Sequence, residues 1–333
     1  MYKTVFFIIM MMGTLISISS MSWLMIWMGL EINLLSLMPL MKNLKNKLSS
    51  ESTIKYFIVQ TMASSLFLFS MILFTNYKTL NIQMNEMSSL MLNSTLIMKM
   101  GAAPFHFWLP EVISGLSWDM CFIILTWQKI APMVILMYST LTSTYLSSII
   151  ILSVLISGIQ GMNQTCFRKL LAFSSINHMS WMLSAMMSSM TIWMYYLIIY
   201  FILNFNIMFM LNKYNVFYMP QLTKLMSHNK NIKCLYMMNF LSLGGLPPFM
   251  GFLPKWLTIN FLINNNFYLL SIILVIFTLM PLFIYIRITM TTFLMNQSES
   301  LMNMETQLKF MYMLILIISL NSLFLYTTMI LIN

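Results

Sequence analysis

The sequence predicts an all-α polytopic membrane protein with about eleven transmembrane helices. Of its 333 residues, 60% are hydrophobic and only 7% are charged, whereas soluble domains contain roughly 25% charged residues. Apolar stretches near the length of about 20 residues that a membrane helix requires recur along the whole chain. We therefore expect one transmembrane domain over residues 1–333, without a separate soluble domain.

The expected spans follow one another with short polar connections, of which the longest runs from Asn212 to Cys234. The expected spans are 4–20, 23–41, 54–75, 88–107, 118–139, 145–162, 168–189, 191–212, 235–257, 267–291 and 309–331.

The basic residues support this count, because they collect on one side when the loops alternate across the membrane. With the N-terminus on that side, Lys78 is the only basic residue on the other side. The thirteen on the N-terminal side are Lys3, Lys42, Lys45, Lys47, Lys55, Arg168, Lys169, Lys213, Lys224, Lys230, Lys233, Arg287 and Lys309. By the positive-inside rule this side is the matrix or cytoplasm. The net charge of +10 therefore reports orientation, and we expect no nucleic-acid partner.

Composition also indicates where the gene is located. Methionine occurs 41 times and alanine six times, as an AT-rich genome with an isoleucine codon reassigned to methionine would produce. This bias predicts mitochondrial encoding. The three cysteines are far apart, and no GxGxxG, Walker or HExxH pattern occurs, so we expect no disulfide, metal, nucleotide, flavin, haem or iron–sulfur site in this chain.

Two stretches of the chain share the pattern P-F-x-x-aromatic-L-P-charge, at Pro104–Glu111 and at Pro248–Lys255. They belong to expected spans that lie five apart, so they cross the membrane in opposite directions. This predicts inverted five-helix repeats over 4–139 and 145–291, followed by a final helix over 309–331. Transporters with such repeats commonly place their working sites at broken helices.

Proline and glycine break the helix in both stretches, because proline lacks a backbone donor and glycine lowers helix propensity. The expected breaks are at Gly101, Pro104, Pro110, Gly245, Pro247, Pro248 and Pro254.

Four ionisable residues lie inside or at the broken middle of expected spans: Glu31, Lys99, Lys129 and Lys255. Burial disfavours the charged form of a lysine, so a lysine within the bilayer can exchange a proton near neutral pH. Each also has a structural reading, since a lysine can extend to the interface and Glu31 can be a simple ion-pair partner. Three lysines and one glutamate do not balance, however, which favours a proton-translocating role for the set.

Two histidines, His106 and His178, also lie within expected spans. Histidine titrates near neutral pH, so both are candidates for a proton path, although a hydrogen-bonded core histidine is equally consistent with either position.

Five motifs carry a family resemblance: WMGLEIN, KMGAAPFHFWLPE, TWQKIAP, SSINHMSWM and LSLGGLPPFMGFLPKW. In this order and spacing, the chain resembles the antiporter-like membrane subunits of mitochondrial respiratory complex I, in the animal and in particular the arthropod form. The resemblance covers essentially the whole chain.

The resemblance implies that Glu31 and Lys99 form a pair, that Lys129 is a bridging lysine, and that Lys255 belongs to the second broken helix. It implies a subunit of the proton-translocating NADH:ubiquinone reductase without a redox centre of its own. NADH, FMN, iron–sulfur clusters and ubiquinone would be bound by other subunits. The expected partners are other membrane-arm subunits, including neighbouring antiporter-like ones, and lipids such as cardiolipin, in the mitochondrial inner membrane with the N-terminus on the matrix side.

Two alternatives are open from the residues alone. The chain could be a free-standing cation/proton antiporter, or a scaffold subunit without its own proton path.

Overall fold

A computed structural model describes residues 2–43, 46–77, 82–139, 142–225, 230–247 and 249–294. The predicted final helix over 309–331 and the predicted break residue Pro248 lie outside this part of the chain. The chain divides into two compact units, Met1–Ile149 and Ile150–Asn333. This division does not test whether two repeats are related by inversion, so the inverted repeats remain a prediction.

The first unit contains seven α-helices, one 3₁₀ turn and the start of an eighth helix among its described residues. They are α1 (Tyr2–Ser19), α2 (Trp23–Met41), α3 (Lys47–Tyr77), α4 (Ile82–Met100), α5 (Trp108–Gly115), α6 (Trp118–Leu125), the 3₁₀ turn η1 (Trp127–Lys129), α7 (Ile130–Tyr138) and the start of α8 (Ser143–Met162).

The second unit is also helical where it is described. It continues α8 and adds α9 (Phe167–Ser188), α10 (Met190–Lys213), α11 (Met219–Leu225), α12 (Lys230–Gly244), α13 (Phe252–Asn264) and α14 (Tyr268–Leu294).

Seven segments of the described chain are long and apolar enough to cross a membrane, which confirms seven predicted spans. They are Tyr2–Ser19, Trp23–Met41, Lys47–Thr75, Trp118–Tyr138, Ser143–Met162, Met190–Lys213 and Tyr268–Thr291. The predicted span 168–189 is a continuous helix, α9, but its polar residues keep it out of this group. The total of eleven spans remains a prediction.

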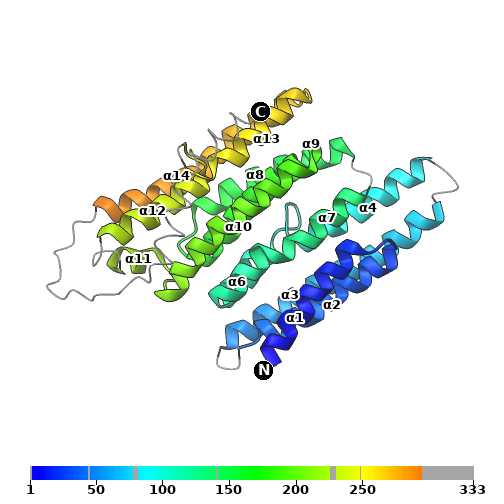
Figure 1. The fold of residues 1–333 in the computed structure, drawn as a ribbon, viewed down its shortest axis with the longest axis horizontal. Helices are drawn as coiled ribbons and strands as arrows, with labels where there is room; N and C mark the ends of the chain where they lie inside the picture. The colour runs from blue at the N-terminus through cyan, green and yellow to red at the C-terminus, as the bar shows by residue number, and fades with distance from the viewer. Residues whose placement is uncertain are drawn as a thin grey trace. The chain divides into compact units, whose positions relative to one another are not determined.

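Helices α1, α2 and α3 lie alongside one another in the first unit (Figure 1). Two glycines bring α1 and α2 close: a Cβ on Gly13 would lie 2.9 Å from the backbone nitrogen of Asn33, and one on Gly29 would lie 2.7 Å from that of Ser17. Small residues commonly allow membrane helices to approach closely. The crossing fixes the position of α2, which carries Glu31.

A helix ends at each of the two predicted breaks, α4 at Met100 and α12 at Gly244. Two of the predicted break residues do not lie in a break, because Pro110 is in the first turn of α5 and Pro254 in the first turn of α13, where a missing N–H costs no helical hydrogen bond.

The ends of α4 and α12 have the same geometry. Gly101 and Gly245 have φ values of 74° and 79°, a left-handed conformation that glycine adopts without the steric cost of a side chain. Each glycine N–H bonds the carbonyl three residues earlier, at 3.2 and 3.0 Å. The next N–H in each case reaches the carbonyl five residues earlier, at 3.3 and 3.4 Å. Both helix ends are therefore Schellman motifs.

A third interruption was not predicted, because 118–139 was expected to be one continuous span. The structure divides it at the 3₁₀ turn Trp127–Lys129, between α6 and α7. Pro132 explains the position, since it has no N–H to bond the carbonyl of Gln128 four residues earlier. A short 3₁₀ segment within a helix often marks a functional position.

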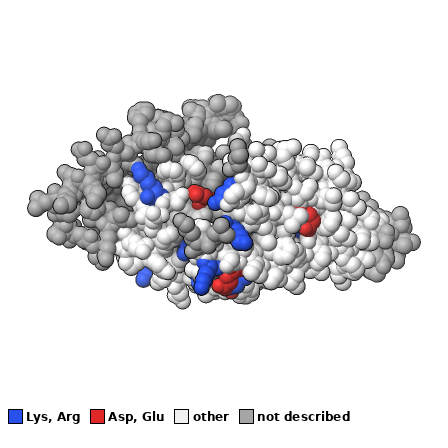
Figure 2. Space-filling view, turned by 90° about the horizontal axis from the view of Figure 1, so that it is seen from below, with Lys and Arg blue, Asp and Glu red and all other residues white. Residues whose placement is uncertain are grey.

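Charged side chains are sparse on the face shown in Figure 2, where most of the described surface is uncharged. Among the charges that the structure describes, exposed Lys55 joins Glu51 at 2.9 Å and Glu111 at 3.0 Å. Exposed ion pairs contribute roughly 0–1 kcal/mol, so this cluster adds little to the stability of the helical core.

Candidate functional site

The last turn of α4 carries Lys99 and is capped by two neutral donors. Trp108 Nε1 donates to the carbonyl of Met98 at 3.1 Å, and Gln60 Nε2 donates to the carbonyl of Lys99 at 3.2 Å. Helix ends leave carbonyls that need partners, and inside a membrane these partners must come from the protein or from buried water. The backbone of the first break is thus satisfied without use of the Lys99 ammonium.

The Lys99 side chain is buried, with 7% of its surface exposed, and its Nζ lies 5.8 Å from the centre of the Phe67 ring. The carboxylate of Glu31 interacts electrostatically with Lys99 and with Tyr56. Both Glu31 and Lys99 are described, and they form no direct ion pair. Glu31 Oε1 is buried and has no hydrogen-bond partner in the described part of the chain.

Lys129 is the last residue of the 3₁₀ turn and is almost fully buried, with 2% of its surface exposed. Its N–H bonds the carbonyl of Thr126 at 3.3 Å. Removing an ionised lysine from water without compensation is costly. Lys129 thus lies where the helix is interrupted, at the end of the 3₁₀ turn.

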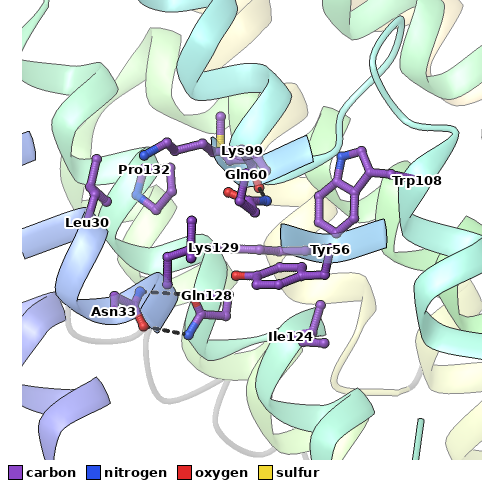
Figure 3. A pocket seen from close by; sticks show the side chains of 12 residues that line it. Leu30, Asn33, Tyr56, Gln60, Lys99, Trp108, Ile124, Gln128, Lys129 and Pro132 are labelled. Carbon is purple, nitrogen blue, oxygen red and sulfur yellow. Dashed lines mark hydrogen bonds between the residues drawn. The ribbon is translucent and has the colours of Figure 1, made fainter. Parts of the chain in front are cut away.

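A single cavity joins Lys99 and Lys129 (Figure 3). Its lining combines the two lysines with four other polar side chains, Asn33, Tyr56, Gln60 and Gln128, and with the apolar side chains of Leu30, Leu34, Met100, Trp108, Ile124 and Pro132. The cavity volume is about 20 Å³, and one ordered water needs roughly 10–15 Å³ and two to four polar partners. The cavity has the room and the donors for about one water between the two lysines.

Asn33 and Gln128 form a reciprocal pair of hydrogen bonds at this cavity, drawn as dashed lines in Figure 3. Asn33 Nδ2 donates to Gln128 Oε1 at 2.8 Å, and Gln128 Nε2 donates to Asn33 Oδ1 at 2.9 Å.

Sequence reasoning missed the polar residues Asn33, Tyr56, Gln60 and Gln128. A signal existed for the two amides of the pair, because polar groups inside a membrane span need partners. Asn33 lies two residues after Glu31 and Gln128 lies immediately before Lys129, so each belongs to one of the motifs that carry the family resemblance.

Lys255 occupies the second break, where it has a different role from Lys99. It lies in the first turn of α13 and is 7% exposed. Its Nζ donates to the carbonyl of Gly244, the last residue of α12, at 2.8 Å. It also lies 5.7 Å from the centre of the Trp181 ring on α9. Here the ammonium itself caps the C-terminal end of a helix, where a cation is favoured.

His178 lies in the same unit, three residues before Trp181 on α9, so the two side chains are one helical turn apart. His178 Nδ1 is 2.9 Å from the hydroxyl of Tyr196, and its ring centre is 5.1 Å from that of Tyr200. The imidazole is 4% exposed. His178 therefore faces two buried tyrosines of α10, and it lies on the same helix as Trp181, which contacts Lys255.

His106 lies in the first break, between α4 and α5. Its Nδ1 is 3.2 Å from the carbonyl of Pro104, and its ring stacks on Phe107 with centres 4.2 Å apart. His106 is buried but does not line the cavity that contains Lys99. Its part in a proton path remains a prediction.

Within the residues that the structure describes, no group of three or more His, Cys, Asp or Glu side chains comes together to hold a metal ion.

Apolar spans, two broken helices and buried lysines at or near their breaks define a polytopic membrane protein of the ion- or proton-translocating class. The chain belongs to the NADH:quinone oxidoreductase/Mrp antiporter transmembrane family, whose model matches residues 20–281. This confirms the resemblance drawn from the sequence motifs.

Similar proteins include two named NADH-ubiquinone oxidoreductase chain 2. The protein from Anopheles gambiae is 48% identical over 300 residues, which cover 90% of this chain and 88% of that protein. The protein from Mus musculus is 38% identical over 319 residues, which cover 92% and 90% of the two chains.

A chain in the structure of respiratory complex I from Thermus thermophilus has a similar fold, with a TM-score of 0.82 and 22% identity. The similarity covers 89% of this chain and 72% of that one. It agrees with the all-α polytopic fold class predicted from the sequence.

Proposed function

We propose that this chain is a proton-translocating membrane subunit of respiratory complex I, the NADH:ubiquinone oxidoreductase of the mitochondrial inner membrane. The family and the names of the insect and mammalian relatives support this proposal. The observation that carries it is the cavity shared by Lys99 and Lys129, because proton transfer needs ionisable groups joined by a polar space.

The roles follow from the environments of the four residues. Glu31 and Lys99 are the pair whose charge state changes, since they interact electrostatically without a direct ion pair. Lys129 relays the proton, because it lines the same cavity as Lys99. Lys255 is the terminal site of proton exchange. His178 belongs to the proton path in the same half of the chain.

The same proposal assigns the redox chemistry to other subunits. NADH, FMN, iron–sulfur clusters and ubiquinone are bound there, and this chain uses the energy of their reaction. Neighbouring antiporter-like subunits flank it, lipids including cardiolipin surround it, and its N-terminus and most basic loops face the matrix.

The proposed pair is tested by a double-mutant cycle in assembled complex I. Glu31→Gln and Lys99→Met are each expected to lower the number of protons moved per NADH oxidised. Glu31 and Lys99 interact electrostatically, so the two residues should not behave independently. The double variant is expected to lose no more pumping than the worse single variant, because both changes disable one pair.

Proton uptake by membrane vesicles and NADH oxidation are measured together in this cycle. If each single variant keeps part of the pumping and the losses in protons moved per NADH add fully in the double variant, the two residues do not act as one pair. Unchanged proton-to-NADH ratios in all three variants would refute the proposed function.

A second candidate is a subunit of a cation/proton antiporter, because the matching family also includes Mrp antiporters. Mild solubilisation of native membranes separates the two functions. We expect the chain to migrate with a large assembly that oxidises NADH on a native gel. Migration in a smaller complex without NADH oxidation would favour the antiporter.

A scaffold subunit without a proton path would pass this migration test. It predicts that neutralising Glu31, Lys99 and Lys255 together leaves pumping unchanged, whereas our proposal predicts that pumping falls.

A further inference from the structure

We propose that Asn33 and Gln128 are positioning residues for the proton relay. Their reciprocal hydrogen bonds hold the turn that carries Lys129 against the helix that carries Glu31. This inference rests on the proposed function and extends it to two residues that titrate at no physiological pH.

The two hydrogen bonds of the pair link α2 to the 3₁₀ turn, two segments that are distant in sequence. Both bonds are short, at 2.8 and 2.9 Å, and Asn33 is buried with 4% of its surface exposed. Asn33 lies two residues after Glu31 on α2, and Gln128 is the direct neighbour of Lys129. Both amides line the same cavity as Lys99 and Lys129 (Figure 3).

The turn depends on side-chain hydrogen bonds because its own backbone hydrogen bonding is weaker than that of the helices on either side. Residues Trp127–Lys129 form a 3₁₀ turn, which has poorer hydrogen-bond geometry than an α-helix, and Pro132 removes one backbone donor from the following turn. Consecutive side chains tie this turn to two neighbouring helices. Trp127 Nε1 donates to Thr14 Oγ1 on α1 at 3.3 Å, and Gln128 pairs with Asn33 on α2.

Amide side chains suit a cavity that is also lined by two lysines proposed to carry protons. A carboxylate there would bind an ammonium and hold its proton, whereas a neutral amide can orient an ammonium or a water without taking the charge. Each amide of the pair uses one N–H and accepts one hydrogen bond, so each keeps a second N–H and a second acceptor site. The pair can therefore fix Lys129 and also bind a molecule in the cavity.

The test separates positioning from mere stability in assembled complex I. Its readouts are protons moved per NADH and the pH profile of that ratio. The chain's own share of pumping is taken as the difference between the natural complex and Lys129→Met. Asn33→Leu alone strands the Gln128 amide and should reduce assembly, because an unpaired buried polar group is costly. Asn33→Leu with Gln128→Met removes both amides and should restore assembly.

Despite this restored assembly, the double apolar variant is expected to lose its share of pumping by at least about tenfold, since a misplacement of about 1 Å can slow a reaction ~10²-fold. Its pH profile should also be displaced. The exchanged variant, Asn33→Gln with Gln128→Asn, keeps two amides of the same combined length and should keep both the share and the profile.

Ser139→Ala is the matched control. Ser139 Oγ donates to Asn93 Oδ1 at 2.5 Å in another buried pair, which joins the C-cap of α7 to α4 and does not line the cavity. This variant should lose a similar hydrogen bond and keep its share of pumping.

A double apolar variant with the natural ratio and pH profile overturns the inference. If that variant does not assemble, Asn33→Ser with Gln128→Asn decides the matter, because these shorter polar side chains cannot reach each other. If that variant loses the chain's share of proton pumping, the positioning role is supported. If it keeps this share, the positioning role is overturned. If Lys129→Met itself pumps normally, the relay role of Lys129 in the proposed function fails, whereas normal pumping by the double variant alone removes only the positioning role.

Discussion

Lys129→Met is expected to abolish the proton transfer carried by this chain while NADH oxidation continues. Methionine resembles lysine in length and volume, so the buried stem is kept and only the ammonium is lost. Removing a group that transfers a proton typically slows that step by about 10²–10⁴-fold. The cavity would then contain Lys99 without its partner. The measurement is protons moved per NADH in vesicles that contain assembled complex.

Lys55→Met is the matched control for this variant. Lys55 is also a lysine of the first unit, but its side chain is 42% exposed and paired with Glu51 and Glu111. Exposed pairs contribute little, so the ratio should stay at its natural value. A natural ratio in Lys129→Met as well would show that Lys129 is not a relay.

Gly251→Ala is expected to prevent the second break from forming and so to remove the chain from the assembled complex. A Cβ at this position would lie only 1.7 Å from the carbonyl oxygen of Ser242 and 2.8 Å from its carbon. That oxygen also accepts the Schellman bond from Gly245 at 3.0 Å, so it cannot move without opening the end of α12. Overpacking typically costs about 1–3 kcal/mol, and contact with fixed backbone places this variant at or above the upper end.

The experiment compares the amount of assembled complex on native gels and its midpoint of thermal unfolding. Gly161→Ala is the control, because a Cβ there would meet side-chain atoms of Ile284 and Phe173 at an ordinary 3.4 Å. We expect it to assemble normally. A Gly251→Ala complex with natural abundance and natural thermal stability would contradict the close approach of these two segments.

Seven of the predicted spans and the two helix ends at Gly101 and Gly245 could be predicted for physical reasons. A membrane span requires a long apolar run, and the run itself marks seven of the observed segments. Proline and glycine have local effects on backbone geometry, so Gly101 and Gly245 could be matched before their shared left-handed conformation was known. The start of α3 at Lys47, seven residues before the predicted span, was missed because its polar first turns carry no apolar signal.

The partners of the buried residues could not be predicted. These helices are apolar on several faces, so the pattern does not show which face turns inward. Asn33 and Gln128 are 95 residues apart in sequence. Their pairing depends on the rotation of α2 about its axis and on the presence of the 3₁₀ turn. The capping of Gly244 by Lys255 likewise depends on how the chain folds back after the break. The roles assigned to the four ionisable residues remain proposals.

The two helix breaks are closed by different kinds of donor, and this difference has a mechanical consequence. Trp108 and Gln60 are neutral at every physiological pH, so the end of α4 is held equally well whatever the charge of Lys99. At the second break the donor is the Lys255 ammonium, and a hydrogen bond from a charged donor is roughly twice as strong as one from a neutral donor. If Lys255 gives up its proton, this hydrogen bond weakens and the last turn of α12 is held less tightly. At this position, a change of charge would also be a change in the hydrogen bonding of the backbone.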